Sequence, residues 1–327
     1  MRHTTMLLFM VLGALVVAAD TASSSSFKGS AALAKEILRI EDEDGQPVAG
    51  AIIHGGLQTG GGINDFVPIN GITSSNGEYV IEGECTNRIR CDVKKDGYYR
   101  AEFLLTSYSS THSCNDGKWM PYGTVNVITL HRRKRLGTLA VPSGRGSNIG
   151  RWRVPKRNSW IGFDFEVFDW VKPYGDGCNQ DALFLFTAYE KDPYFDFRFT
   201  MDICFTNSPF AGAYVCKKNR YSDLQWPSCA DSNGTYRTNF SYSFERHPNG
   251  ERIVNTLPDD ACMVFRTRTK VNDAGELVSA HYGVISGGWL LGSETMRFND
   301  ACFNPNANDL CIEDGCHLRK QAKSHRE

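Results

Sequence analysis

Three segments in the first third of the chain carry its strongest structural signal: ILRIEDEDGQPVAGAII (37–53), TSSNGEYVI (73–81) and VKKDGYY (93–99). We call these segments the three phrases. In each phrase, aliphatic or aromatic residues flank an Asp-Gly or Asn-Gly pair. Such pairs tolerate the positive φ angles of tight turns, and β-branched and aromatic residues suit a half-buried pleated surface. The phrases therefore predict strands joined by tight turns.

Their order resembles the carboxypeptidase regulatory-like domain, in which the pattern D.DG.PV.GA.I is followed by T...G.Y.I and V...GY at similar distances. The resemblance covers about residues 36–130 and implies a seven-stranded, transthyretin-like (prealbumin-like) β-sandwich. It does not imply peptidase activity, because in that family this module accompanies catalytic domains and many unrelated extracellular proteins without being catalytic.

The N-terminus has the features of an export signal. Residues 1–19 combine Arg2 and His3 with an apolar run over 6–17 and a small-residue cleavage pattern at 17–19, which predicts a secretory signal peptide. The polar residues 20–35 read as a flexible tether. No other run is long enough to span a membrane. We therefore expect a secreted or extracellular protein, periplasmic or cell-surface in a bacterial host.

Eleven cysteines follow the signal, which indicates an oxidising compartment and disulfide bonds. The odd number leaves one thiol unpaired or bonded to another molecule, and the absence of C-x-x-C pairs disfavours structural zinc. The disulfide candidates are Cys85, Cys91, Cys114, Cys178, Cys204, Cys216, Cys229, Cys262, Cys302, Cys311 and Cys316.

Residues 131–158 form a basic, Gly- and Pro-containing stretch that predicts a linker between two domains. Within it, Arg132–Arg135 has the form of a dibasic processing site in a eukaryotic host, or is simply solvated. The net charge of −1 gives no global preference for nucleic acid, which we do not expect as a partner.

The second domain is predicted over 159–317, before a charged tail at 318–327. Period-two alternation over 160–170 and 194–202, and a hairpin over 263–285, indicate antiparallel strands with one buried face. We predict a larger antiparallel β-sandwich or jelly roll, tied by up to four disulfides, so that the whole chain is all-β. Sequons at Asn233 and Asn239 are glycosylation candidates in a eukaryotic host.

Catalytic motifs are scarce. No histidine belongs to an H-E-x-x-H or H-x-x-E zinc motif, so metallopeptidase activity is not expected. Asp164, Glu166, Asp169 and Asp202 could supply the carboxylate pair of an extracellular carbohydrate-active hydrolase. The simpler interpretation makes them the polar halves of alternating strands.

Calcium is a second open alternative, since it prefers oxygen ligands, although turn chemistry explains the same residue types equally well. The possible ligands are Asn299, Asp300, Asn304, Asn306, Asn308, Asp309, Glu313 and Asp314.

Tryptophan and tyrosine near predicted turns could stack on sugar rings, and Trp152, Trp170, Tyr174 and Trp226 are the candidates. We therefore expect a secreted, non-catalytic binding or surface-structural protein. A polysaccharide or another cell-surface component is its candidate partner.

Overall fold

The structure is a computed structural model. It describes residues 31–60, 62, 65–105, 113–134, 139–142, 151–192, 194–205, 209–219, 221–287, 290–291, 294–298 and 300–313. All regular elements within these ranges are strands, which confirms the all-β prediction. The predicted signal peptide, most of the tether, Arg135, Cys316 and the tail lie outside the described residues. The described residues contain no helix with the length and apolar character needed to cross a bilayer.

The first domain packs two sheets face to face. Its strands are β1 (Ala32–Asp42), β2 (Ile52–Gln58), β3 (Phe66–Ile72), β4 (Glu78–Cys85), β5 (Ile89–Lys94), β6 (Ala101–Leu105), β7 (Ser113–Asn115), β8 (Lys118–Met120) and β9 (Thr124–Leu130). One sheet has the order β4-β1-β8-β7, with β9 also pairing in parallel with β1, and the other has the order β3-β2-β5-β6. The described part thus has nine strands where the resemblance implied seven, and the additional short hairpin is β7–β8.

The turn glycines behave as the sequence requires. Gly45 and Gly77 have φ angles of 73° and 76°, a region that glycine enters without a Cβ clash. Asp42 caps the first turn by accepting hydrogen bonds from the N–H groups of Asp44 and Gln46, both at 2.9 Å. Gly77 also lies against the carbonyl of Ile40, where an added Cβ would be 2.5 Å from that oxygen. Its smallness therefore matters for packing as well as for the turn.

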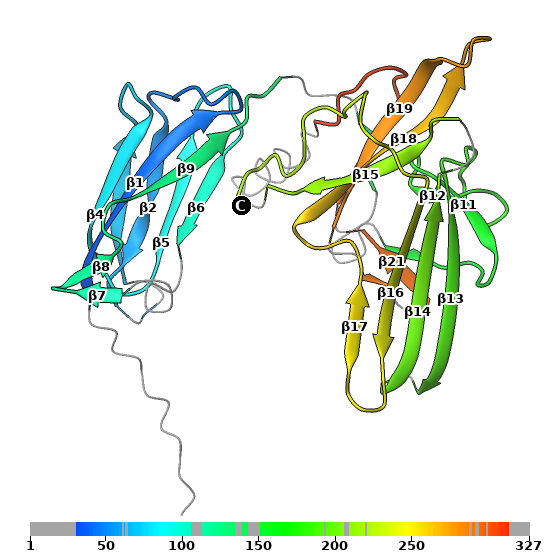
Figure 1. Cartoon of the computed structure of the whole chain (residues 1–327), viewed down its shortest axis with the longest axis horizontal. Helices are drawn as coiled ribbons and strands as arrows, with labels where there is room; N and C mark the ends of the chain where they lie inside the picture. The colour runs from blue at the N-terminus through cyan, green and yellow to red at the C-terminus, as the bar shows by residue number, and fades with distance from the viewer. Residues whose placement is uncertain are drawn as a thin grey trace, which may run out of the picture.

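The second domain contains three sheets (Figure 1). Its strands are β10 (Arg151–Arg153), β11 (Trp160–Asp164), β12 (Asp169–Trp170), β13 (Ala182–Asp192), β14 (Asp196–Cys204), β15 (Gly212–Lys217), β16 (Asn239–Arg246), β17 (Arg252–Asn255), β18 (Ala261–Val271), β19 (Leu277–Ser286), β20 (Leu290–Leu291), β21 (Thr295–Arg297) and β22 (Ala301–Asn304). The sheets run β12-β11-β13-β14-β16-β17, β15-β18-β19-β22 and β10-β21-β20.

An aromatic core fills the space between the six-stranded sheet and the other two sheets. Phe163 lies at its centre, with ring centroids 5.1 to 5.6 Å from Phe165, Trp170, Trp152 and Phe184 in edge-on contacts. The expected strand over 160–170 is wrong in one respect: the chain leaves β11 after Asp164, turns, and returns as β12. Val167 is consequently exposed instead of joining the core.

The first half of β18, residues 261–265, is buried on both faces, which explains its continuous apolar sequence. The face of β18 that points away from the aromatic core packs against a second apolar cluster, which includes Leu224, Trp226 and Ile312. We call this cluster the cover. Leu139 and Val141 join this cover, and Ala140 pairs with Phe303 through two backbone hydrogen bonds. Part of the stretch predicted as a linker therefore belongs to the second domain.

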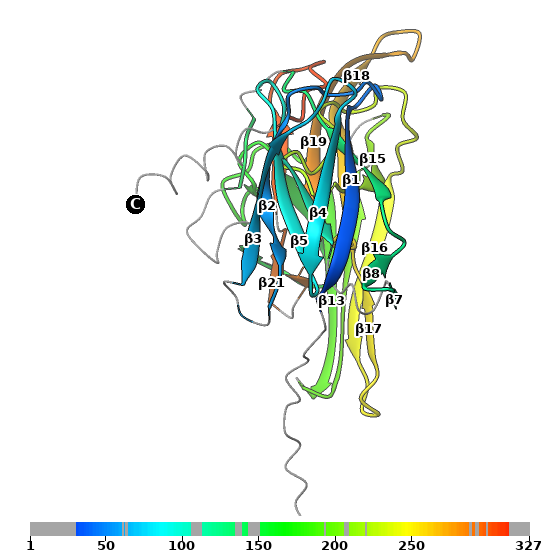
Figure 2. The same cartoon turned by 90° about the vertical axis from the view of Figure 1, so that its left-hand side faces the viewer.

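The two domains meet through the Tyr98–Glu102 segment of the first, and Figure 2 looks onto that domain with the second behind it. Tyr99 is fully buried in the second domain's cover, where its hydroxyl donates to Glu313 at 2.7 Å. The Glu102 N–H donates to the Tyr221 carbonyl, and Arg100 pairs with Asp223 at 3.0 Å. The junction therefore combines apolar burial, backbone pairing and an ion pair.

Candidate functional site

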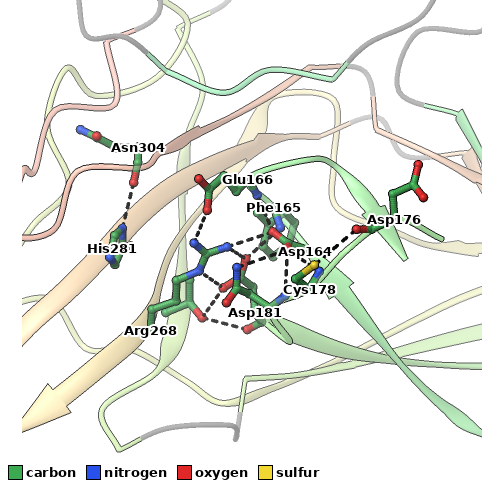
Figure 3. A network of polar contacts seen from close by, with 11 residues as sticks. Asp164, Phe165, Glu166, Asp176, Cys178, Asp181, Arg268, His281 and Asn304 are labelled. Atoms are coloured by element: carbon green, nitrogen blue, oxygen red, sulfur yellow. Dashed lines mark hydrogen bonds and ion pairs between the residues drawn. The ribbon is translucent and has the colours of Figure 1, made fainter. Parts of the chain in front are cut away.

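Two of the four carboxylates expected to serve a hydrolase, Asp164 and Glu166, contact one guanidinium, that of Arg268, together with Asp181 (Figure 3). A β-bulge in β18 lifts Arg268 out of the regular ladder, and its φ of 50° is in the left-handed region. Nη2 lies 2.9 Å from Asp164 and 2.9 Å from Asp181, Nε lies 2.7 Å from Asp181, and Nη1 contacts Glu166. No sequence pattern indicates Asp181, because its role depends on β13 beginning beside β11.

Backbone donors occupy the remaining oxygen positions of the two buried carboxylates. Asp164 accepts the N–H groups of Glu166, Cys178 and Asn179 at 2.8 to 3.0 Å. Burial acts to raise the pKa of Asp164, but those N–H groups and the Arg268 charge bring it below its ordinary value. For Asp181, burial dominates and raises the pKa against the opposing effect of Arg268.

This arrangement suits anchoring better than acid–base catalysis. Asp164 and Asp181 are 2% and 0% exposed and already bonded at both oxygens, so a substrate would have to displace the contacts that fix them. His281, which Figure 3 shows apart from this cluster, stacks on Phe303 and contacts the Asn304 carbonyl at 3.3 Å. Burial lowers the pKa of His281.

The other two carboxylate candidates lie elsewhere. Asp169 accepts the N–H groups of Trp170 and Asp176, both at 2.8 Å, which is a turn-capping role. Asp202 lies on β14 with its side chain on the outer face of the six-stranded sheet. The structure therefore joins Asp164 to Glu166 but brings neither Asp169 nor Asp202 into the Arg268 cluster.

The aromatic candidates are mostly part of the core, which corrects the expectation of exposed platforms. Trp170 and Trp226 are both 3% exposed, and their indole N–H groups donate at 2.8 Å to the Arg153 and Ile312 carbonyls. Half-buried Trp152 donates to the Phe168 carbonyl. Of the four, Tyr174 is exposed, at 43%.

A different pair of aromatic side chains is exposed on the outer face of the six-stranded sheet. Trp160 and Tyr189 are 48% and 57% exposed, and strand register places both on the face opposite the aromatic core. We call this face the outer platform. It consists of three rows across the sheet: Trp160, Leu185, Asp202 and Ser241; Thr187, Thr200, Ser243 and Asn255; and Tyr189, Arg198, Glu245 and Ile253.

Hydroxyl and amide groups predominate between the two aromatic side chains. The Thr187 and Thr200 hydroxyls hydrogen-bond to each other at 2.5 Å, and Ser243 continues their row. Arg198 pairs with Glu245 at 3.2 Å, which offsets the charge of both. The outer platform is therefore polar but weakly charged, with an aromatic side chain near each end.

Several of the oxygen-bearing residues proposed for calcium accept hydrogen bonds from the backbone, and Glu313 accepts one from the Tyr99 hydroxyl. Asn304 and Asn308 accept the N–H groups of Asn306 and Ala280, and Asp309 accepts that of Cys311. Asn299 and Asp314 lie outside the described residues. Over the described ranges, no group of three or more His, Cys, Asp or Glu side chains is arranged to hold a metal ion.

The glycosylation candidates Asn233 and Asn239 are both exposed. The described cysteines carry no formed disulfide, so disulfide bonding stays a prediction. The strand register nevertheless places Cys216 opposite Cys262, and Cys229 opposite Cys311.

A comparison of the chain with protein-family models finds no match, and a comparison with curated proteins finds none either. The resemblance of residues 36–130 to the carboxypeptidase regulatory-like domain therefore depends on its three phrases alone.

Proposed function

We propose that this chain is an exported, non-catalytic binding protein that holds a neutral polysaccharide chain across the outer platform. One observation carries the proposal: Trp160 and Tyr189 are exposed near opposite ends of one face, with hydroxyl side chains between them. The first domain, by its resemblance, would serve as a spacer or stabiliser.

The chemistry of the outer platform fits sugars. An exposed aromatic side chain presents a flat apolar face together with a polar edge, which suits the mixed surface of a sugar ring. Four residues along β13 separate Tyr189 from Leu185, the partner of Trp160, so the two aromatic residues are roughly 14 Å apart. That distance suits separate units of one extended chain.

The charge pattern favours a neutral ligand and disfavours hydrolysis. Glycoside hydrolysis requires two carboxyl groups within about 10 Å of one another. Asp202 faces Ser241, whereas Glu245 is four residues farther along the same strand, roughly 13 Å away, and is paired with Arg198. Asp202 therefore lacks a free carboxylate partner within the three rows of the platform.

The test is binding of the mature protein to immobilised neutral glucans, xylans and mannans, with hydrolysis measured on the same sugars. We expect saturable binding to at least one of them without release of reducing ends. Trp160→Ala and Tyr189→Ala should each weaken that binding by about 3- to 10-fold, because each removes one aromatic contact.

Tyr174→Ala is the matched control, because Tyr174 is exposed to a similar degree but lies in the turn after β12. It should leave binding unchanged. Binding that survives the loss of both Trp160 and Tyr189 would contradict the outer platform. The absence of binding to any of these sugars would contradict the polysaccharide and leave a structural role.

A further inference from the structure

Two cysteines face each other on neighbouring strands of the four-stranded sheet. Cys216 is next to the last residue of β15, and Cys262 is opposite it near the start of β18. Their Sγ atoms are 2.8 Å apart, with Cys262 fully buried and Cys216 half-buried. The pair is thus held in contact by the sheet itself.

The backbone geometry permits a covalent bond without rearrangement. Directly opposed residues in antiparallel strands have Cα atoms about 4.5 or 5.5 Å apart, depending on their place in the ladder. Both separations fall within the range of about 4.4 to 6.8 Å that disulfides require. The register therefore already provides the spacing that a cross-strand bond needs.

We propose that Cys216 and Cys262 form a cross-strand disulfide in the mature protein. The two thiols lose two protons and two electrons as the Sγ–Sγ bond forms. A disulfide oxidant such as oxidised glutathione accepts them and is reduced to two thiols.

The reactivity of the pair agrees with this assignment. The hydrogen bond between the two thiols lowers the pKa of Cys216. The same hydrogen bond, together with burial, raises the pKa of Cys262. Cys216 is also the more accessible of the two. It is therefore the thiolate that would attack the oxidant, and Cys262 would then close the bond.

The bond would fix the base of the segment that holds the two domains together. After Cys216 the chain leaves β15 and reaches Tyr221–Asp223, the residues that pair with Arg100 and Glu102 of the first domain. It then supplies Trp226 to the cover over β18. A disulfide at Cys216 would keep the start of this segment attached to β18 even if Trp226 and the other residues that cover β18 separated from the sheet.

The experiment is a peptide map of the full mature protein, purified without reductant and then exposed to oxidised glutathione. Free thiols are blocked with N-ethylmaleimide in denaturant before digestion with trypsin. Cys262 falls alone in peptide 253–266, and Cys216 falls with Cys204 in peptide 199–217. We expect these two peptides to be cross-linked, with tandem fragmentation locating the bond at Cys216, and to separate on reduction.

Cys204→Ser and Cys216→Ser are matched variants of the same peptide. The cross-link should persist in the first and disappear in the second. In guanidinium chloride, reductant should raise the unfolding equilibrium constant of the wild type, because it breaks the bond. The corresponding increase in Cys216→Ser should be smaller by tenfold or more. A maleimide-labelled Cys262 in the unreduced protein, or Cys262 linked to any other cysteine, would overturn the assignment.

Discussion

The Arg268 cluster leads to a quantitative prediction about stability. Replacing Arg268 with Met removes the charge and keeps an unbranched, mostly apolar side chain. Asp164 and Asp181 would then remain buried without their cationic partner, whereas Glu166, with 44% of its side chain exposed, would be solvated. Breaking a buried ion pair from one side costs about 3–5 kcal/mol. We expect Arg268→Met to lower the free energy of unfolding by about that amount.

Arg198→Met is the matched control, because Arg198 also pairs with a strand carboxylate but has 59% of its side chain exposed. Although Glu245 has only 12% of its side chain exposed, the exposed guanidinium is screened by water, so this variant should cost about 1 kcal/mol or less. The assay is guanidinium chloride unfolding at pH 7, followed by tryptophan fluorescence. If Arg268→Met were within about 1 kcal/mol of Arg198→Met, the anchoring role would be refuted.

The same comparison has a defined pH dependence. In the wild type the pKa of Asp164 is lowered, so its contribution is complete above the unfolded pKa and is lost as the pH falls through the folded pKa. Without Arg268 the pKa values of both buried carboxylates are higher than in the wild type, so acidification stabilises the variant relative to the wild type. The stability difference between wild type and Arg268→Met should therefore shrink as the pH falls below about 5.

Two further substitutions test the domain junction and the turn phrases. Tyr99→Phe should lower the free energy of unfolding by about 1–3 kcal/mol, because it removes the 2.7 Å hydrogen bond to the buried Glu313 carboxylate. The assay is urea unfolding, with Tyr98→Phe as the control. Equal effects of the two substitutions would contradict this role for the Tyr99 hydroxyl. Gly77→Ala should cost at least about 1 kcal/mol more than Gly45→Ala, since both have positive φ but only at Gly77 would a Cβ meet a backbone oxygen. Equal thermal melting temperatures for the two alanine variants would contradict that reasoning.

Local patterns were sufficient for the strands and tight turns. Alternation over 195–202 correctly placed Phe197, Phe199 and Met201 in the core, because side-chain direction in a strand has a period of two residues. Phe195, expected on the same face, precedes β14 and is 56% exposed. The Asn-Gly pair at 76–77 likewise specified a turn from its own conformational preferences. These features depend on neighbours in the chain, so they can be predicted from the sequence alone.

Other features depend on partners distant in the chain and therefore follow only from the assembled fold. Trp170 and Tyr189 are aromatic residues on strands of the same sheet, yet one packs against Phe163 and the other is exposed, because burial depends on which sheet covers a face. Asp164, Asp181 and Arg268 come together from β11, the start of β13 and a bulge in β18. Their spacing in the sequence does not predict this cluster. The register that brings Cys216 opposite Cys262 is likewise fixed by pairing across 46 residues. A sequence pattern gives the direction of a side chain, but only the assembled sheets determine what that side chain meets.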